Sequence, residues 1–148
     1  MFEKSLKAGW GDMDFNGHMR NTAYLDKAAD VRMEFFSENG FGMREFQRRR
    51  LGPVILRDEL EYRREVGLLE TVRVTQQLVG LSEDGSNWIM CNAFYRGDGE
   101  LAARLTSCGS WLDLAARRLQ APPEDLLAAL RRMPQSADFQ VLPSRIER

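Results

Sequence analysis

The chain has 148 residues, 43% of them hydrophobic and 29% charged, with a formal net charge of −1. This composition is typical of one soluble globular domain that buries a core without metals or disulfides, and it excludes a largely disordered chain. The near-zero net charge also predicts no extended basic surface, so we expect no nucleic acid as a partner.

Neither a membrane segment nor a metal site is expected. No apolar stretch approaches the roughly 20 residues that cross a bilayer, and the N-terminus lacks the apolar core of a signal peptide. We therefore expect a cytoplasmic protein without membrane contact. Cys91 and Cys108 have no metal-ligand spacing, and one histidine adds too few ligands, so no metal and no cofactor is predicted. Two buried thiols are expected, with a disulfide between them left open.

The first part of the chain predicts a strand, a polar connection and a long helix. Apolar residues fall mostly on even positions from Phe2 to Trp10, which favours a half-buried strand. Residues 11–20 are a polar connection that contains glycine, and Asn21 and Thr22 are both good N-cap residues. The helix that follows has one apolar stripe and ends at a glycine-containing segment: Tyr24, Ala28, Val31, Phe35, then Asn39-Gly40.

The rest of the chain reads mainly as strands. Strands are predicted at 54–66, 71–81, 88–95 and 101–114, joined by glycine-containing turns at 83–86 and 97–99. A short helix is expected to start near residues 121–125 and to close at Arg131 and Arg132. Residues 134–148 have no clear period and are expected to be loosely held.

This order predicts an α+β fold, with a curled antiparallel sheet of five strands around one long central helix and a short C-terminal helix. We expect one domain over residues 1–133, followed by a C-terminal tail over 134–148. The sheet would leave one edge strand poorly covered.

The segment before the helix carries the candidate chemistry. It places carboxylates, an amide and an imidazole next to a helix N-terminus, where free backbone N–H groups favour negative charge. Thioester hydrolysis needs a group that attacks or activates water, and donors for the developing oxyanion. Asp14 could supply the first and the amides near Asn21 the second. His18 could orient Asp14 or move a proton, and Asn16 could bind a carbonyl or a water.

The same residue types also fit roles without chemistry. Asp12 and Asp14 could shape a turn or cap the helix, and from residue types alone this interpretation is favoured. His18 could be a solvated side chain, and Asn16-Gly17 is a common turn pair.

A resemblance to a known family changes this balance. The segment resembles the signature of hotdog-fold thioesterases, closest to the 4-hydroxybenzoyl-CoA thioesterase-like family: Asp12-x-Asp14-x-Asn16-Gly17-His18-x-x-Asn21-x-x-Tyr24-Leu25, with Arg32 and Phe35-Phe36 further along the helix. The resemblance implies a hotdog fold, Asp14 as the catalytic carboxylate and a backbone N–H near Asn21 that polarises the carbonyl. By similarity to plant acyl-carrier-protein thioesterases, Asn16 and His18 join the site.

The chain departs from that signature at two places. Many relatives have two consecutive asparagines before the helix, and the first is Arg20 here. Many also carry a helix glutamate at the position of Ala29, with Asp30 beside it here. A mechanism that depends on such a glutamate is therefore not expected.

The substrate implied by the resemblance is an acyl-CoA, bound between the subunits of a homodimer or a dimer of dimers. Arginine suits the CoA phosphates, although the arginines also fit a solvated face balanced by Glu59, Glu61 and Glu65. The expected substrate contacts are Gly17, Arg20, Tyr24, Arg57, Arg63 and Arg64. A further basic run is Arg44, Arg48, Arg49 and Arg50.

The predicted function is thus a thioesterase that hydrolyses acyl-CoA, aryl-CoA or acyl-carrier-protein thioesters to a free acid and a thiol. Two alternatives stay open: a hotdog hydratase or dehydratase, and a non-catalytic acyl-CoA-binding module. The acyl group stays open too, with Phe35, Trp88, Phe94 and Trp111 as candidates to line its pocket.

Overall fold

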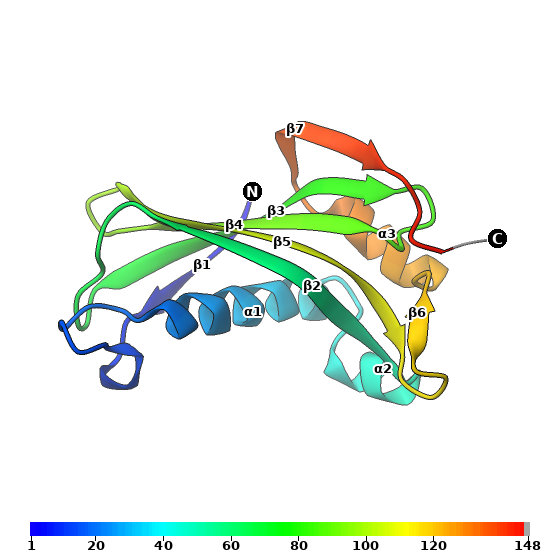
Figure 1. Ribbon diagram of the computed structural model, residues 1–148, viewed down its shortest axis with the longest axis horizontal. Coiled ribbons are helices and arrows are strands. Elements are labelled where there is room, and N and C mark those ends of the chain that lie inside the picture. The colour runs from blue at the N-terminus through cyan, green and yellow to red at the C-terminus, as the bar shows by residue number, and fades with distance from the viewer. Residues whose placement is uncertain (147–148) are drawn as a thin grey trace.

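One curved sheet lies over a long helix in the computed structural model, which describes residues 1–146 (Figure 1). The helices are α1 (Asn21–Glu38), α2 (Met43–Arg48) and α3 (Glu124–Arg132), and a 3-10 turn spans Trp10–Asp12. The strands are β1 (Phe2–Lys7), β2 (Leu51–Tyr62), β3 (Thr71–Ser82), β4 (Trp88–Tyr95), β5 (Leu101–Asp113), β6 (Arg118–Gln120) and β7 (Gln135–Leu142).

The sheet has the strand order β1-β3-β4-β5-β2, and neighbours on this path are antiparallel. β6 pairs with the end of β5, and β7 runs parallel to β3. β2 therefore forms one edge of the sheet, while β1 and β7 share the other. The predicted α+β class and the five antiparallel strands are confirmed, but the described sheet has seven strands.

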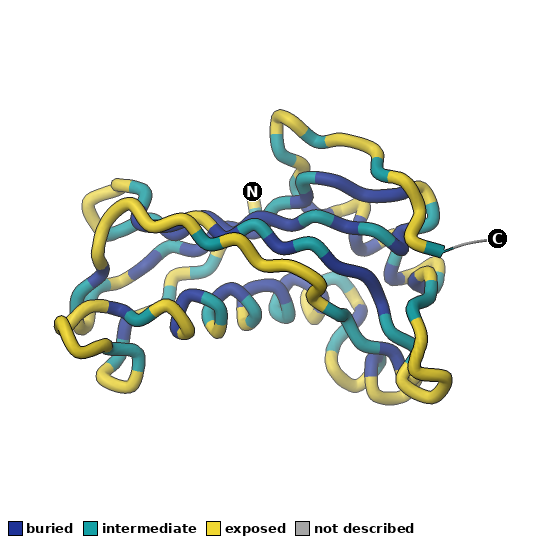
Figure 2. Tube along the Cα trace, in the orientation of Figure 1, coloured by how far each residue is buried: buried dark blue, intermediate teal, exposed yellow. Residues whose placement is uncertain are grey.

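α1 is long because its apolar stripe has a surface to pack on. Its buried side faces the sheet, where it contacts β1, β3 and β5 (Figure 2). Lys4 of β1 holds the helix from the side through ion pairs with Glu34 and Glu38. Asn39 caps the helix C-terminus and Gly40 follows with a φ of 84°, as the sequence predicted.

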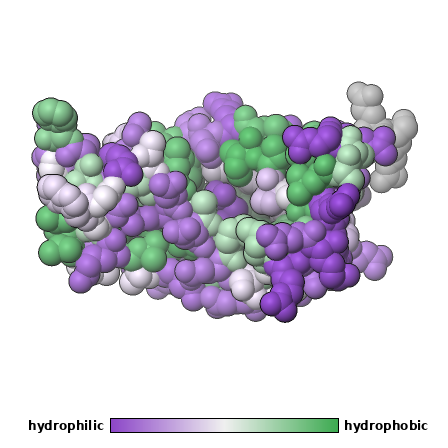
Figure 3. Space-filling model, turned by 90° about the horizontal axis from the view of Figure 1, so that it is seen from below, coloured by the Kyte–Doolittle hydropathy of each residue, from purple (hydrophilic) through white to green (hydrophobic). Residues whose placement is uncertain are grey.

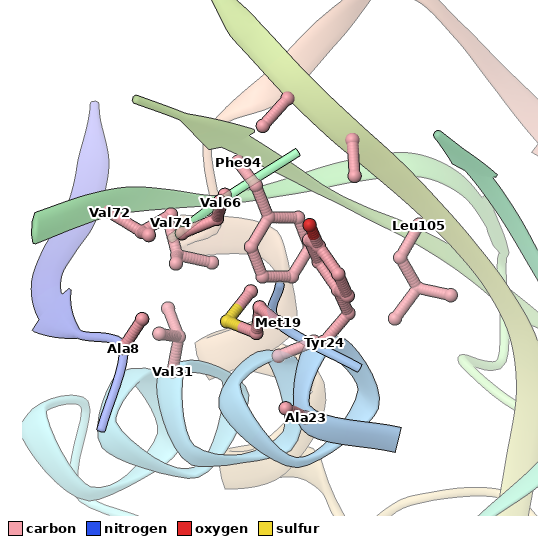
Figure 4. Close-up of a cluster of buried hydrophobic side chains, with 13 residues drawn as sticks. Ala8, Met19, Ala23, Tyr24, Val31, Val66, Val72, Val74, Phe94 and Leu105 are labelled. Atoms are coloured by element: carbon pink, nitrogen blue, oxygen red, sulfur yellow. The ribbon is translucent and has the colours of Figure 1, made fainter. Parts of the chain in front are cut away.

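Two buried clusters form the core, one under each half of α1. The first lies under the N-terminal half and includes Tyr24 packed edge-on against Phe94 of β4 (Figure 4). The second lies under the C-terminal half, where Phe36 packs edge-on against Trp111 and Phe46. Fully burying such aromatic side chains stabilises the fold by several kcal/mol.

The bounds of two strands differ from the prediction. β1 ends at Lys7 instead of Trp10, because the chain turns at Gly9 into the 3-10 turn and leaves Trp10 81% exposed. β2 begins at Leu51, before Pro53, since an edge strand tolerates proline on its free side. β2 stops at Tyr62, where the N–H groups of residues 63 and 64 both donate to the Ala102 carbonyl.

The expectation of a loose tail after residue 134 is wrong for most of that segment. Residues 135–142 form β7, whose Phe139 packs against the second core cluster. Residues 147–148 of the expected tail lie outside the described residues. α2 and β6 were not predicted either. Both are short and follow a turn, so they have too few residues to display a period.

The structure decides between a disulfide and two free thiols, because Cys91 of β4 lies opposite Thr106 and Cys108 of β5 lies opposite Ile89. Cys91 is buried, Cys108 is half-buried, and both are free thiols. Burial raises the pKa of the Cys91 thiol. Within residues 1–146, no helix is both long enough and apolar enough to cross a membrane.

Candidate active site

The loop before α1 is a tight turn that presents Asp14. Met13 and Met19 form a bridge at its base, and the Asp14 N–H donates to the His18 carbonyl at 2.7 Å. The Gly17 N–H donates back to the Asp14 carbonyl, and Gly17 has a φ of 77°, which favours glycine. A second bridge between His18 and Gly67 ties the loop to the connection between β2 and β3.

The Asp14 carboxylate is held by two backbone donors and remains exposed. Its Oδ1 accepts the N–H groups of Asn16 at 2.8 Å and of His18 at 3.0 Å. These hydrogen bonds, that of His18 above all, keep the pKa of Asp14 below its usual range. Asp14 is therefore ionised at neutral pH, and the two bonds to Oδ1 leave Oδ2 available.

The first turn of α1 lies next to this carboxylate and has a free donor. Arg20 is the N-cap, with a φ of −77° and a ψ of 159°, so the prediction of Asn21 or Thr22 as N-cap is wrong by one residue. The reason is that the Arg20 carbonyl accepts the N–H of Ala23. The Asn21 side chain accepts the Thr22 N–H instead, and within residues 1–146 the Asn21 N–H donates no hydrogen bond.

An open pocket of about 510 Å³ unites these groups. Seven of the ten predicted site residues line it: Asp14, His18, Arg20, Asn21, Tyr24, Arg63 and Arg64. Three further residues that the sequence motif did not indicate also line the pocket: Met19, Tyr62 and Glu65. Tyr62 packs edge-on against Tyr24 with ring centroids 5.5 Å apart, and only the folded chain brings these two rings together. Burial raises the pKa of Tyr24 to about 12, so its hydroxyl stays protonated.

The remaining predicted residues lie outside the pocket lining. Asn16 contributes its backbone N–H to Asp14, and Gly17 shapes the turn. Arg57 is exposed on β2, where it pairs with Glu59. Ala29 and Asp30, which stand near the helix glutamate of many relatives, do not line the pocket either.

The basic run around α2 lies at the opposite end of α1 from Asp14. Figure 3 shows strongly hydrophilic side chains gathered at that end of the face that carries the helices. Arg48 and Arg49 pair with Glu45, and Arg49 also pairs with Asp125, so part of this charge is balanced. None of these arginines lines the Asp14 pocket.

Arg32 of α1 is a buried cation without a hydrogen bond inside the described chain. Its side chain is almost fully buried, and within residues 1–146 its Nε has no partner. Burial lowers the pKa of Arg32, and the charge of Asp58 on β2 opposes that shift. Within residues 1–146 the two groups form no ion pair, and the Asp58 carboxylate accepts the Ser107 hydroxyl at 2.6 Å.

The four aromatic residues expected to line an acyl pocket belong to the core instead. Phe35, Trp88, Phe94 and Trp111 are all at most 2% exposed and line none of the pockets described here. Two of them also use their ring N–H inside the fold, since Trp88 donates to the Ser110 carbonyl and Trp111 to the Gly85 carbonyl. Among residues 1–146, no three His, Cys, Asp or Glu side chains gather into a site that could hold a metal ion.

Comparison with models of protein families identifies the superfamily of the chain. The family model of the thioesterase-like superfamily matches residues 8–130, so the chain belongs to that superfamily. The matched range contains every residue of the Asp14 pocket. A comparison with curated protein sequences gives no significant match.

Solved structures share the fold at low sequence identity. A hypothetical protein from Staphylococcus aureus, solved in complex with CoA, is 20% identical with a TM-score of 0.79, over 92% of this chain and 87% of that one. The probable thioesterase YbaW from Escherichia coli is 20% identical with a TM-score of 0.75, over 91% and 100%. A 1,4-dihydroxy-2-naphthoyl-CoA thioesterase from Synechocystis is 10% identical with a TM-score of 0.79, over 88% and 96%. These likenesses support the hotdog fold that the sequence predicted.

Proposed function

We propose that this protein is a thioesterase that hydrolyses acyl-CoA thioesters, with Asp14 as the reacting carboxylate and the Asn21 N–H as a donor to the carbonyl oxygen. The observation that carries the proposal is that both groups line one open pocket, each with unused hydrogen-bonding capacity. Membership of the thioesterase-like superfamily supports it.

The carbonyl oxygen would sit at the N-terminus of α1. The free Asn21 N–H lies there at the positive end of the helix dipole, which stabilises an oxygen that gains negative charge. Losing one such donor typically slows an enzyme roughly 10²–10³-fold.

Asp14 can act by either of two routes, direct attack or activation of a water molecule, and its lowered pKa weakens the carboxylate in both. In direct attack, an Asp14 oxygen bonds to the thioester carbon and the CoA sulfur leaves as a thiolate. Water then cleaves the mixed anhydride, which releases the acid and restores Asp14. The other route has Asp14 orient the water that attacks.

The mouth of the pocket suits a phosphorylated carrier. Arg20, Arg63 and Arg64 line it, and guanidinium groups bind phosphate well. Arg64 is paired with Glu100 at the surface, so a phosphate would compete for it. The Staphylococcus aureus relative solved with CoA supports this choice of carrier.

The working unit in this proposal is a homodimer formed through β2. This strand is an edge of the described sheet, and Ile55 and Leu56 are exposed near its middle. An exposed apolar edge strand is a template for pairing with another chain, and two-fold pairing is the commonest closed arrangement.

The test is thiol release from a panel of acyl-CoA and aryl-CoA thioesters by the native protein and by Asp14→Ala. Asp26→Ala, which changes an exposed carboxylate elsewhere on α1, is the matched control. We expect the control to match the native protein and Asp14→Ala to lose roughly 10²–10⁴-fold in rate. In a single turnover in ¹⁸O-labelled water, label in Asp14 identifies direct attack followed by cleavage of the anhydride at the Asp14 carbonyl. Label in the released acid alone fits attack by an activated water or cleavage of the anhydride at the acyl carbonyl.

Other outcomes point to the alternative functions. If the native protein releases no thiol, and the native and Asp14→Ala proteins bind acyl-CoA with the same affinity, the protein is a binding module. If it adds or removes water on an unsaturated acyl-CoA, it is a hydratase or dehydratase.

A further inference from the structure

The end of the molecule opposite the Asp14 pocket has an exposed surface that is both apolar and cationic (Figure 1). It is formed by α2 with the turn that follows it, and by the turn that joins β5 to β6. The two segments are in contact, because the Leu114 N–H donates to the Arg50 carbonyl at 2.9 Å. Residues 43–50 and 113–118 together are called the α2 surface below.

Positive charge is concentrated on the α2 surface. It contains six arginines and two acidic residues, although the whole chain has a formal net charge of −1. Both acids are engaged within the chain, because Glu45 pairs with Arg48 and Arg49, while Asp113 accepts two backbone N–H groups of its own turn. Four exposed arginines form no ion pair within residues 1–146: Arg44, Arg50, Arg117 and Arg118.

Two of these arginines have a left-handed backbone. Arg50 has a φ of 50° and Arg117 a φ of 57°, in the region that favours glycine or asparagine. A residue with a larger side chain in this region costs about 1–3 kcal/mol. Glycine or asparagine would make either turn at a lower cost, so the geometry of the turns does not by itself account for the two arginines.

Apolar groups lie among these charges. Met43 is 58% exposed and Leu114 41% exposed, and Ala115 and Ala116 follow Leu114 in the exposed part of the turn. Met43 and Leu114 also border an apolar cavity of about 210 Å³, in which Gln47 is the only polar lining side chain. The α2 surface therefore combines exposed apolar side chains with cations that lack a partner in the described chain.

We propose that the α2 surface docks on an anionic lipid bilayer. The unpaired arginines lie among the lipid phosphates, while Met43 and the tip of the β5–β6 turn enter the interface between headgroups and acyl chains. A nucleic acid would also attract the arginines, but it offers no apolar phase to Met43 and Leu114. The expectation of no membrane contact considered spanning segments and signal peptides, and docking on a surface needs neither. The proposal is independent of the proposed function.

The first test is flotation of the protein with phosphatidylcholine vesicles that contain about a third of phosphatidylglycerol, and with vesicles of phosphatidylcholine alone. We expect binding to the anionic vesicles only, weakened by added salt. Arg50→Asn combined with Arg117→Asn removes two charges and keeps residues that tolerate a left-handed backbone. The partition coefficient should fall roughly 25-fold, about fivefold for each arginine. Arg57→Gln combined with Arg104→Gln, at exposed positions of β2 and β5, changes the net charge equally and should leave the partition coefficient near the native value.

The second test is whether the apolar groups enter the lipid. Met43→Gln keeps the length of the side chain and should lower the partition coefficient roughly fivefold. Trp10→Phe removes the exposed native tryptophan, and the other two are buried. In that background, Ala115→Trp fluorescence should be quenched by brominated phosphatidylcholine in the anionic vesicles. Phe15→Trp, at a fully exposed position of the Asp14 loop, is the matched control and should not be quenched.

The proposal is overturned if the native protein floats with neither kind of vesicle or with both equally. It is also overturned if the two asparagine substitutions leave the partition coefficient unchanged, or if Phe15→Trp is quenched and Ala115→Trp is not. Binding to heparin without binding to anionic vesicles would identify a polyanion site instead. None of these outcomes affects the proposed thioesterase activity, which is measured in the absence of lipid.

Discussion

The two ends of α1 differ in what they leave unsatisfied. At the N-terminal end, Asp14 is exposed, the Asn21 N–H has no hydrogen-bond partner among residues 1–146, and the adjoining pocket is open to solvent. At the C-terminal end, Phe36 and Trp111 are fully buried among aromatic neighbours, and the cavity beside them is lined almost only by apolar groups. The polar end has groups that can react, whereas the buried cluster at the apolar end has only large aromatic and aliphatic side chains that stabilise one half of the core. Chemistry and stability should therefore be separable by mutation.

The largest expected effect is a loss of stability in Phe36→Ala, at the apolar end. Phe36 is fully buried and packs against Phe35, Phe46 and Trp111, so its loss should lower the free energy of unfolding by about 3–5 kcal/mol. Acetyl-CoA turnover per folded molecule should stay near the native value. Phe15→Ala, at a fully exposed ring of the Asp14 loop, is the control and should change stability by less than about 0.5 kcal/mol. Equal losses from both variants would contradict the division.

Asn21→Pro tests the polar end, where we expect a loss of activity with little change in stability. Proline is well tolerated at the first position of a helix, and the extended backbone of Arg20 suits a residue before proline. The variant keeps α1 but removes the N–H proposed to bind the carbonyl oxygen, so kcat should fall roughly 10²–10³-fold. Asn21→Ala retains that N–H and should lose far less. Melting curves should show little change for either variant. Equal rates for Asn21→Pro and Asn21→Ala would show that the Asn21 N–H takes no part in the reaction.

A smaller effect on stability is expected from Asp84→Asn, near α3 and β7. Although burial opposes its ionisation, hydrogen bonds from Ser144, Ser86 and Ser82 hold the pKa of Asp84 well below its usual range. The stabilisation by this carboxylate is therefore present above about pH 4 and is lost as the pH falls below that value. Denaturant unfolding at pH 7 should show a loss of about 1–2 kcal/mol, which shrinks towards pH 2. A difference that is independent of pH would contradict the role of the charge.

Much of the fold was predictable because its elements have strong internal periods. The bounds of β4 matched the prediction, and α1 was displaced only at its N-cap. β7 could not be predicted, since few of its residues are apolar and its pairing depends on the distant β3. Trp10 shows the opposite case, because it continues the apolar period of β1 in the sequence but lies in a turn that exposes it.

The residues of the candidate site also fall into a group that the sequence indicates and a group that only the fold brings together. Asp14, His18 and Asn21 were found because one short segment contains them all, and a local motif is visible in the sequence. Tyr62 is the last residue of β2 and Glu65 follows that strand, and nothing in their own sequence neighbourhood relates them to that motif. The four aromatic residues expected to line an acyl pocket belong to the core for a related reason. Sequence shows which side chains are apolar, but the fold decides which of them lack neighbours.

The two edges of the sheet have different consequences for growth of an assembly. β2 offers one continuous strand of 12 residues. The opposite edge is divided, because antiparallel β1 covers β3 up to Gln76 and parallel β7 covers it from Leu78 onwards. A single incoming strand cannot run antiparallel to both segments, and short, interrupted edges discourage pairing. In the proposed pairing through β2, addition of copies along the sheet would therefore stop at two, and the open-ended ribbons to which a sheet with two equal edges is liable would not form.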